Sequence, residues 1–113
     1  MREPKVTKEM TEVFNLQAEL CKSLADPKRL MILHMLRGGP RSVNELAEML
    51  RLKQSNTSQH LAVLRNGGLI TPQRQGNAIY YSLANPSITT ACDLVREIIS
   101  ERLQRNQSLA NMM

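Results

Sequence analysis

The sequence predicts a single, mainly α-helical domain that carries one small β-hairpin. Apolar residues recur at spacings of three and four along most of the 113 residues, which is the period of an amphipathic helix. Only 3% of the residues are aromatic, so the core must consist of Leu, Ile, Val and Met, which favours helices packed on helices. Two short β-prone runs on either side of a Gln-Gly-Asn turn predict the hairpin.

The first two helices have recognisable ends. The spacing of apolar residues predicts a helix over residues 6–24 and a second one within residues 25–39. Asp26 is placed to cap the second helix, Pro27 suits its first position, and Gly38-Gly39-Pro40 ends it. The apolar stripe of the first helix consists of Val6, Met10, Val13, Phe14, Leu20, Cys21 and Leu24.

The third and fourth helices form a pair joined by a short turn. Ser42 and Glu45 have the spacing of a capping box, which predicts a helix that begins after Ser42. The fourth helix is expected over residues 54–66, because Gly67-Gly68 follows. The turn between the two helices lies around Arg51-Leu52-Lys53, so the pair reads as a helix-turn-helix.

A hairpin and a last helix complete the chain. The strands are expected within residues 69–74 and 78–83, and Pro72 favours an edge position because it has no backbone N–H. A final helix is expected over 87–105, and the tail 106–113 carries little signal. A hairpin directly after a helix-turn-helix is a wing. The predicted fold is therefore a winged helix-turn-helix in the order helix, helix, helix, helix, hairpin, helix, and residues 1–113 form one domain.

Charge and polarity point to an anionic partner. The formal net charge is +5, and no Asp or Glu occurs from residue 49 to residue 92. The fourth helix lies in that acid-free window. At 100° per residue, Thr57, Leu61 and Leu64 share one side of it. The opposite side is rich in amides and hydroxyls, from Ser55, Asn56, Ser58, Gln59 and Asn66.

This polar face suits the major groove of DNA. Asn and Gln each carry a donor and an acceptor that match adenine, and the start of a recognition helix makes most base contacts. We expect Asn56 and Gln59 to read bases, with Gln54, Ser55 and Ser58 close to the groove. His60 in the same helix is expected to pack or to contact DNA. The predicted phosphate ligands are Arg41, Lys53, Arg65 and Arg74, and the predicted wing contacts are Gln75 and Asn77.

The sequence resembles the ArsR/SmtB family of small winged-helix repressors over about residues 15–105. The resemblance lies in "LADPKRLMILHML", "SVNELAEML", "QSNTSQHLAVLRNGGLI" and "GNAIYYSL". It implies a homodimer joined through the first and last helices, and release from DNA by a metal ion or another small signal. The chain has Ala62 where members often have Lys, which implies a weaker attraction to phosphates.

Few residues are available to sense such a signal. The last helix has no histidine, and the third helix has no Cys-x-Cys motif, so the metal sites that the resemblance implies are not expected, nor is a cofactor. His34 is expected to be a partly buried structural residue. Cys21 and Cys92 lie on apolar stripes and remain candidates for core packing, for a redox or sulfur switch, or for a soft-metal site.

The predicted function is that of a sequence-specific, dimeric DNA-binding repressor acting on an inverted repeat. The alternative is a winged helix that binds protein instead of DNA, which an exposed apolar patch on the fourth helix would favour. We expect no enzyme, because no nucleophile-base set or phosphate loop is present. No run approaches the ~18 apolar residues of a membrane span, and the start, MREPKVTKEM, is unlike a signal peptide. A cytoplasmic protein with reduced thiols is therefore expected.

Overall fold

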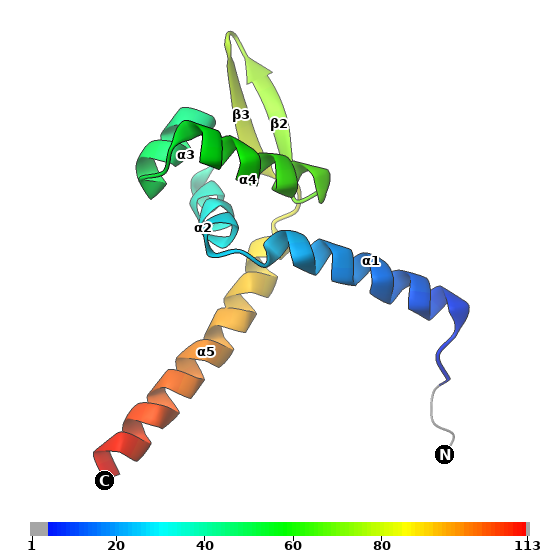
Figure 1. The fold of residues 1–113 in the computed structure, drawn as a ribbon, viewed down its shortest axis with the longest axis vertical. Helices are drawn as coiled ribbons and strands as arrows, with labels where there is room; N and C mark the ends of the chain where they lie inside the picture. The colour runs from blue at the N-terminus through cyan, green and yellow to red at the C-terminus, as the bar shows by residue number, and fades with distance from the viewer. Residues whose placement is uncertain (1–4, 113) are drawn as a thin grey trace.

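The computed structural model describes residues 5–112, so Met1–Pro4 and Met113 of the predicted domain lie outside the described part. Within it, the predicted winged helix-turn-helix is confirmed (Figure 1). The elements are α1 (Lys8–Leu24), α2 (Pro27–Met35), the 3-10 helix η1 (Leu36–Gly38), β1 (Arg41–Ser42), α3 (Val43–Leu50), α4 (Gln54–Asn66), β2 (Ile70–Gln75), β3 (Ala78–Leu83) and α5 (Ser87–Met112).

The core lies where α2, α3, α4 and the base of the hairpin meet. Each helix contributes its apolar stripe, because burying such a stripe against a neighbour is what stabilises a short amphipathic helix. No aromatic residue is among the core residues. The buried cluster consists of Ile32, Leu33, Leu36, Leu46, Leu61, Leu64, Leu69 and Ile70.

The predicted helix starts are confirmed by their caps. The carboxylate of Asp26 accepts from the backbone N–H groups of Lys28 (2.8 Å) and Arg29 (3.2 Å), and Pro27 occupies the first turn. The hydroxyl of Ser42 accepts from the N–H of Glu45 at 3.2 Å. These side chains satisfy donors that a helix start otherwise leaves free. The caps therefore set where α2 and α3 begin.

The wing is a three-stranded antiparallel sheet in the order β1-β3-β2. Ile70 pairs with Leu83 and Gln75 with Ala78, so Gly76 and Asn77 form the turn, with Gly76 at φ +63°. Pro72 lies on β2, which is an edge strand, as predicted. The sequence did not predict β1, whose Arg41 pairs with Tyr81. A strand of two residues is too short to show an alternating pattern in the sequence. β1 is recognised only through its pairing with β3.

Three expectations need correction. α1 begins at Lys8 rather than at residue 6, because Thr7 is its N-cap. α5 continues past residue 105 to Met112, since residues 106–112 contain no Gly or Pro to end a helix. His34 was expected to be partly buried and is exposed, because α2 turns Ile32 and Leu33 to the core and His34 away from it.

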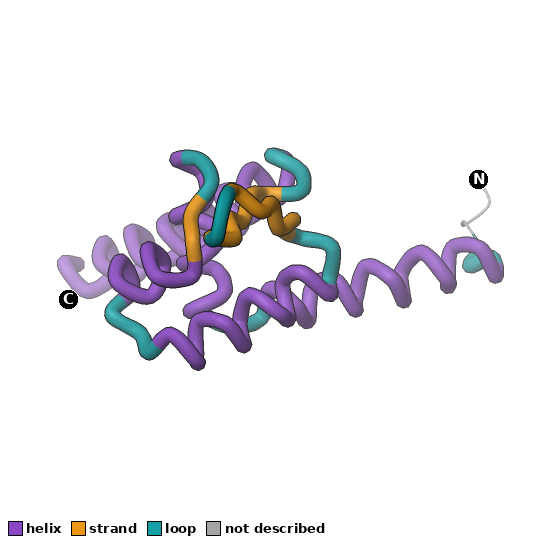
Figure 2. The backbone as a smooth tube through the Cα atoms, turned by 90° about the horizontal axis from the view of Figure 1, so that it is seen from above, coloured by secondary structure: helices purple, strands orange, loops and turns teal. Residues whose placement is uncertain are grey.

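α1 and α5 extend outward from the compact part of the molecule in different directions (Figures 1 and 2). α1 has no buried residue, and the described residues span 58 × 49 × 21 Å. Large apolar side chains of both helices are exposed in the single chain. None of the helices within residues 5–112 combines the length and the apolar character that crossing a membrane requires.

Candidate nucleic-acid interface

α4 is attached to the core by one narrow side. Thr57, Leu61 and Leu64 are at most 1% exposed, and the Thr57 hydroxyl donates to the carbonyl of Lys53 at 3.0 Å. This internal hydrogen bond satisfies the one polar side chain on that side. The remaining surface of α4, apart from His60 and the end that approaches α1, is therefore available to a partner. The polar residues that it exposes are Gln54, Ser55, Asn56, Ser58, Gln59, Arg65 and Asn66.

The start of α4 is electropositive. Its N-cap, Lys53, makes no side-chain hydrogen bond to the helix, and its first turn has no acidic residue. The first N–H groups of an α-helix have no partner within the helix, and the helix dipole adds partial positive charge there. Arg51, in the turn before α4, is exposed and holds a left-handed conformation with φ 54°. An anion that approaches this end therefore meets N–H donors and two cationic side chains.

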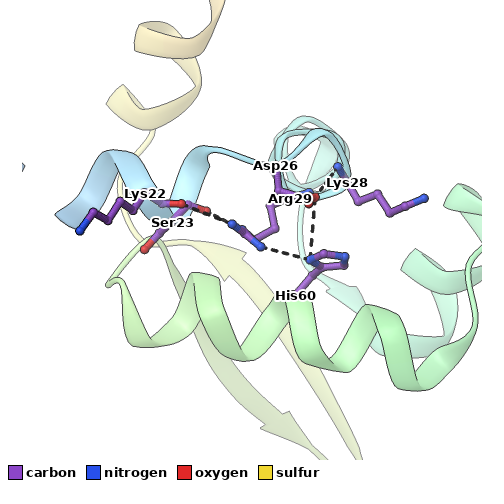
Figure 3. A network of polar contacts seen from close by, with 6 residues as sticks. All are labelled: Lys22, Ser23, Asp26, Lys28, Arg29 and His60. Atoms are coloured by element: carbon purple, nitrogen blue, oxygen red, sulfur yellow. Dashed lines mark hydrogen bonds and ion pairs between the residues drawn. The ribbon is translucent and has the colours of Figure 1, made fainter. Parts of the chain in front are cut away.

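His60 faces a different direction from the other predicted site residues of α4. Its ring points at the start of α2, with Nδ1 3.4 Å from Nη1 of Arg29 and 3.9 Å from Oδ1 of Asp26 (Figure 3). The side chain is only 20% exposed. His60 thus packs between α4 and α2. A DNA contact from it stays a prediction.

The carboxylate beside His60 is held in its charged form. Burial on its own raises the pKa of Asp26, but backbone hydrogen bonds from Arg29 and Lys28, together with attraction to His60 and Arg29, outweigh it. The pKa of Asp26 is therefore lowered from its ordinary value. Asp26 consequently acts as a charged cap for α2 and as a negative neighbour for the imidazole.

The predicted phosphate ligands fall into two groups. Lys53, Arg65 and Arg74 are exposed, and no carboxylate pairs with them anywhere in residues 5–112. Arg41 differs, because it is half-buried beside β3 and its Nη1 lies 3.8 Å from Glu45. Its Nε is buried without a hydrogen-bond partner. Three of the four cations are thus free at the surface, and Arg41 is partly engaged within the protein.

The wing supplies a separate set of polar groups. Arg74 and Gln75 end β2, and Asn77 lies in the turn; all three are exposed. The hairpin projects from the body beyond α4 (Figure 1). The wing and α4 together form an exposed surface without an acidic residue, as the acid-free window predicts.

The two cysteines border one hollow on another part of the molecule. Cys21 of α1 is exposed, Cys92 of α5 is half-buried, and both are free thiols. They line an open hollow of about 900 Å³ together with Gln17, His34, Arg96 and apolar residues of α1, α2 and α5. Within the described residues no three His, Cys, Asp or Glu side chains come close enough to hold a metal ion. Both thiols therefore border this hollow, and no metal-ligand set lies there among the described residues.

The residue that connects these elements, Arg29, was not predicted from the sequence. Arg29 contacts both α1 and His60 of α4, yet nothing in the spacing of the chain predicts a contact between positions 31 residues apart. The only available signal was that Arg29 lies in one of the segments on which the family resemblance rests.

Comparison with known proteins identifies the family. Residues 26–71, which contain the helix-turn-helix, match the family described as bacterial regulatory protein, arsR family. An uncharacterized HTH-type transcriptional regulator of Mycobacterium tuberculosis, Rv0081, is 40% identical over 96 residues, which cover 84% of each chain. Its crystal structure superposes with a TM-score of 0.75 at 39% identity and covers 83% of this chain and 95% of that one.

Two further relatives extend the comparison. The biofilm growth-associated repressor of Agrobacterium fabrum is 42% identical over 81 residues, which cover 72% of this chain and 66% of the relative. The solution structure of a homodimeric winged helix-turn-helix DNA-binding domain from Mycobacterium bovis, described as a possible ArsR-family regulator, has a TM-score of 0.78 at 28% identity. It covers 89% of this chain and 94% of that chain. With the exposed polar face of α4 and its adjacent wing, these matches show that the chain belongs to the ArsR family of bacterial helix-turn-helix transcriptional regulators.

Proposed function

We propose that this protein is a homodimeric repressor that binds an inverted repeat in double-stranded DNA and places one α4 helix in each of two major grooves. The observation that carries the proposal is the outer face of α4. Every amide and hydroxyl residue predicted to meet the groove is exposed there, whereas the opposite side is fixed in the core. The repressing direction is supported by the similarity to the Agrobacterium repressor.

In this arrangement α4 reads the base edges. The major groove of B-DNA admits an α-helix, and each base pair presents its own donor and acceptor pattern there. Asn56 and Gln59 supply amides that match adenine, and Gln54, Ser55 and Ser58 lie near the N-terminal end that usually contacts bases. The proposed base readers thus occupy the exposed first half of the helix.

The cations hold the protein on the phosphate backbone. Lys53, Arg65 and Arg74 have no competing carboxylate within residues 5–112, so each is available to pair with a phosphate. Arg41 has a carboxylate neighbour in Glu45 and makes a weaker candidate. Gln75 and Asn77 at the end of the wing are proposed to reach the adjacent minor groove or the backbone. These contacts set affinity and salt dependence rather than the choice of sequence.

A second copy of the chain is proposed to cover the apolar faces of α1 and α5. Monomers rarely expose large contiguous apolar surfaces. The related Mycobacterium bovis domain is a homodimer, which supports the same assembly here. Such a dimer presents its two recognition helices about one DNA turn apart, roughly 34 Å. The exposed apolar residues include Met10, Val13, Phe14, Leu94, Val95, Ile98, Ile99 and Leu103.

The alternative of a protein-binding winged helix has less support. A protein partner for α4 would favour an exposed apolar patch on that helix. Val63, at 39% exposed, is the single large apolar side chain that α4 exposes, and it lies beside Leu16 and Leu20 of α1. The remaining exposed face is polar, which favours DNA.

The two thiols are proposed as the place where a signal acts. Cys21 and Cys92 border the same hollow, and that hollow lies between α2 and the two helices of the proposed dimer interface. An adduct on either thiol adds volume between these helices and changes the subunit arrangement. Affinity for DNA then falls to the extent that the two arrangements bind DNA differently.

A salt titration of DNA binding tests the proposed function. The affinity for a duplex selected by this protein from a random pool should fall steeply with added salt, as condensed counterions are released. Lys53→Ala and Arg65→Ala should each reduce the salt slope by about one. Arg105→Ala on α5 is the control and should leave the slope unchanged. Affinity that does not respond to salt, or that is equal in all three variants, contradicts the proposal.

A further inference from the structure

Four residues form a junction where the end of α1 meets α4. Ser23 lies in the last turn of α1, Arg29 lies in α2, and His60 and Gly67 lie in the middle and at the end of α4. We name this set the α1–α4 junction. It concerns two helices with different proposed tasks, since α1 carries part of the dimer face and α4 carries the DNA-reading face.

The guanidinium of Arg29 links the two helices directly. Its Nε donates to the carbonyl of Ser23 at 2.7 Å, and its Nη2 donates to the carbonyl of Lys22 at 3.3 Å. Nη1 lies 3.4 Å from Nδ1 of His60 (Figure 3). Because the guanidinium is planar and rigid, these three contacts fix its orientation relative to both helices. One side chain thus connects the carbonyl end of α1 to the imidazole of α4.

A close approach at Gly67 provides a second and independent contact. A Cβ at this position would lie 2.6 Å from the hydroxyl oxygen and 3.0 Å from the Cβ of Ser23. The φ of Gly67 is −77°, which any residue can adopt, so the absence of a side chain here serves the approach rather than the backbone conformation. Ser23 therefore contacts Arg29 through its carbonyl and packs on Gly67 through its side chain.

We propose that Arg29 is a positioning residue that sets the angle of α4 to α1, and thereby the half-site spacing that the dimer accepts. The inference rests on the proposed function above. If two copies associate through α1 and α5, the distance between their α4 helices depends on how each α4 is held against its own α1. The contacts made by Arg29 and Gly67 hold α4 against α1 at two points along α4. They therefore restrict both the tilt of α4 relative to α1 and the distance between the two helices.

The test measures a spacing profile instead of a single affinity. The full-length protein is titrated with the inverted repeat that the wild type selects, and with repeats whose half-sites are moved together or apart by one or two base pairs. The wild type should prefer one spacing. Arg29→Met and His60→Ala should reduce that preference by about 2- to 10-fold, the effect expected for the loss of a typical intramolecular hydrogen bond. Lys28→Met removes a neighbouring exposed cation and should keep the wild-type profile.

Two rescue variants distinguish positioning from a general loss of stability. His60→Gln places an amide oxygen that can accept from Arg29 on the same helix and should keep the spacing preference. Gly67→Ala should weaken the preference by forcing Ser23 away, and Ser23→Gly in the same chain should restore it because it removes the two nearest atoms that the new Cβ meets and leaves only the Val63 carbonyl oxygen at 3.4 Å. All variants are compared well below their melting temperatures, so that the protein is folded in every titration. A change in the spacing profile then does not come from unfolded protein.

The outcomes separate the inference from the function on which it rests. If the wild type prefers one spacing and Arg29→Met keeps that preference, the positioning role is wrong and the repressor proposal stands. A loss that is equal at all spacings and is accompanied by a smaller salt slope makes Arg29 a phosphate ligand, which also overturns the inference. If the wild type binds no duplex, the proposed function itself fails.

Discussion

Arg37 and Asp93 join the body of the molecule to α5 by an ion pair, with Nη1 of Arg37 2.7 Å from Oδ1 of Asp93. The two residues are 56 positions apart, and Arg96 contacts the same oxygen at 3.0 Å. The hydrogen bond from Arg37 is the main reason why the pKa of Asp93 is lowered, and it acts with the nearby Arg96 to outweigh the opposing effect of burial. This pair therefore ties the first half of α5, which carries part of the proposed dimer face, to η1.

Asp93→Asn should lower the stability of the protein at neutral pH. A carboxyl whose pKa is lower in the folded than in the unfolded chain stabilises the fold while it is ionised. That contribution is complete above the ordinary aspartate pKa of about 3.9 and is lost as the pH falls through the folded value. Urea denaturation of both proteins should show a difference in the free energy of unfolding that stays constant from pH 7 down to the ordinary aspartate pKa of about 3.9. The difference should then shrink and vanish as the pH falls towards 2. A difference that grows on acidification would show that the pair does not stabilise the fold.

Gln59→Ala should relax the choice of base at one position of each half-site. The loss of a bidentate amide contact costs about 1–3 kcal/mol of discrimination against the wrong base. This discrimination is measured by competition binding with duplexes in which each base pair of the half-site is substituted in turn. Gln107→Ala, an exposed amide near the end of α5, serves as the control and should leave discrimination intact. An equal loss for all duplexes would identify Gln59 as a backbone contact.

Leu64→Ala should destabilise the whole domain. Leu64 is 0% exposed and belongs to the cluster that attaches α4 to α2 and to the base of the hairpin. Removing a fully buried leucine side chain typically costs about 2–5 kcal/mol, because the cavity closes only partly. The shift of the urea midpoint measures this cost. Val63→Ala on the exposed side of the same helix should change the midpoint far less.

Ile98→Glu should dissociate the dimer without unfolding the chain. Ile98 is 51% exposed in the single chain, so a charge there costs little until a partner covers it. Burying the carboxylate in an apolar interface costs at least about 2 kcal/mol, or roughly a thirtyfold weaker association. Sedimentation equilibrium measures the dimer, and circular dichroism checks the fold. Gln107→Glu, which adds the same charge nearer the end of α5, is the control and should leave the dimer intact. A dimer that tolerates Ile98→Glu would place the interface elsewhere.

Replacing both thiols should abolish the response of DNA binding to a thiol-reactive signal. In the wild type, titration with an oxidant or with polysulfide should weaken binding as Cys21 and Cys92 are modified. The Cys21→Ser/Cys92→Ser double variant should bind DNA as the wild type does before treatment and should not respond afterwards. The two single variants show which thiol matters. A double variant that still responds would exclude the cysteines as the sensor.

Features of the sequence that act over one or two turns of chain predicted much of this structure. Asp26 and Ser42 cap helices where expected, because a cap bonds to N–H groups two or three residues away. The end of α4 follows from Gly67-Gly68, and its division into a buried stripe and a polar face follows from the helical period. The acid-free window is likewise visible in the chain without any structure. By contrast, the end of α5 was misjudged, since its last residues carry no marked pattern.

What the sequence determined by itself was the order of the helices α1 to α5 and of the β2–β3 hairpin, and the chemistry of the face that α4 exposes, because these depend on neighbours within a few residues. The tertiary structure alone decided which side of α2 is covered, and so that His34 is exposed. It also decided that Arg41 pairs with Tyr81 in the sheet, that Cys21 and Cys92 border one hollow, and that Arg29 reaches from α1 to His60. These relationships join residues far apart in the chain. Their geometry is set by how the helices pack on the common core, for which no local pattern exists.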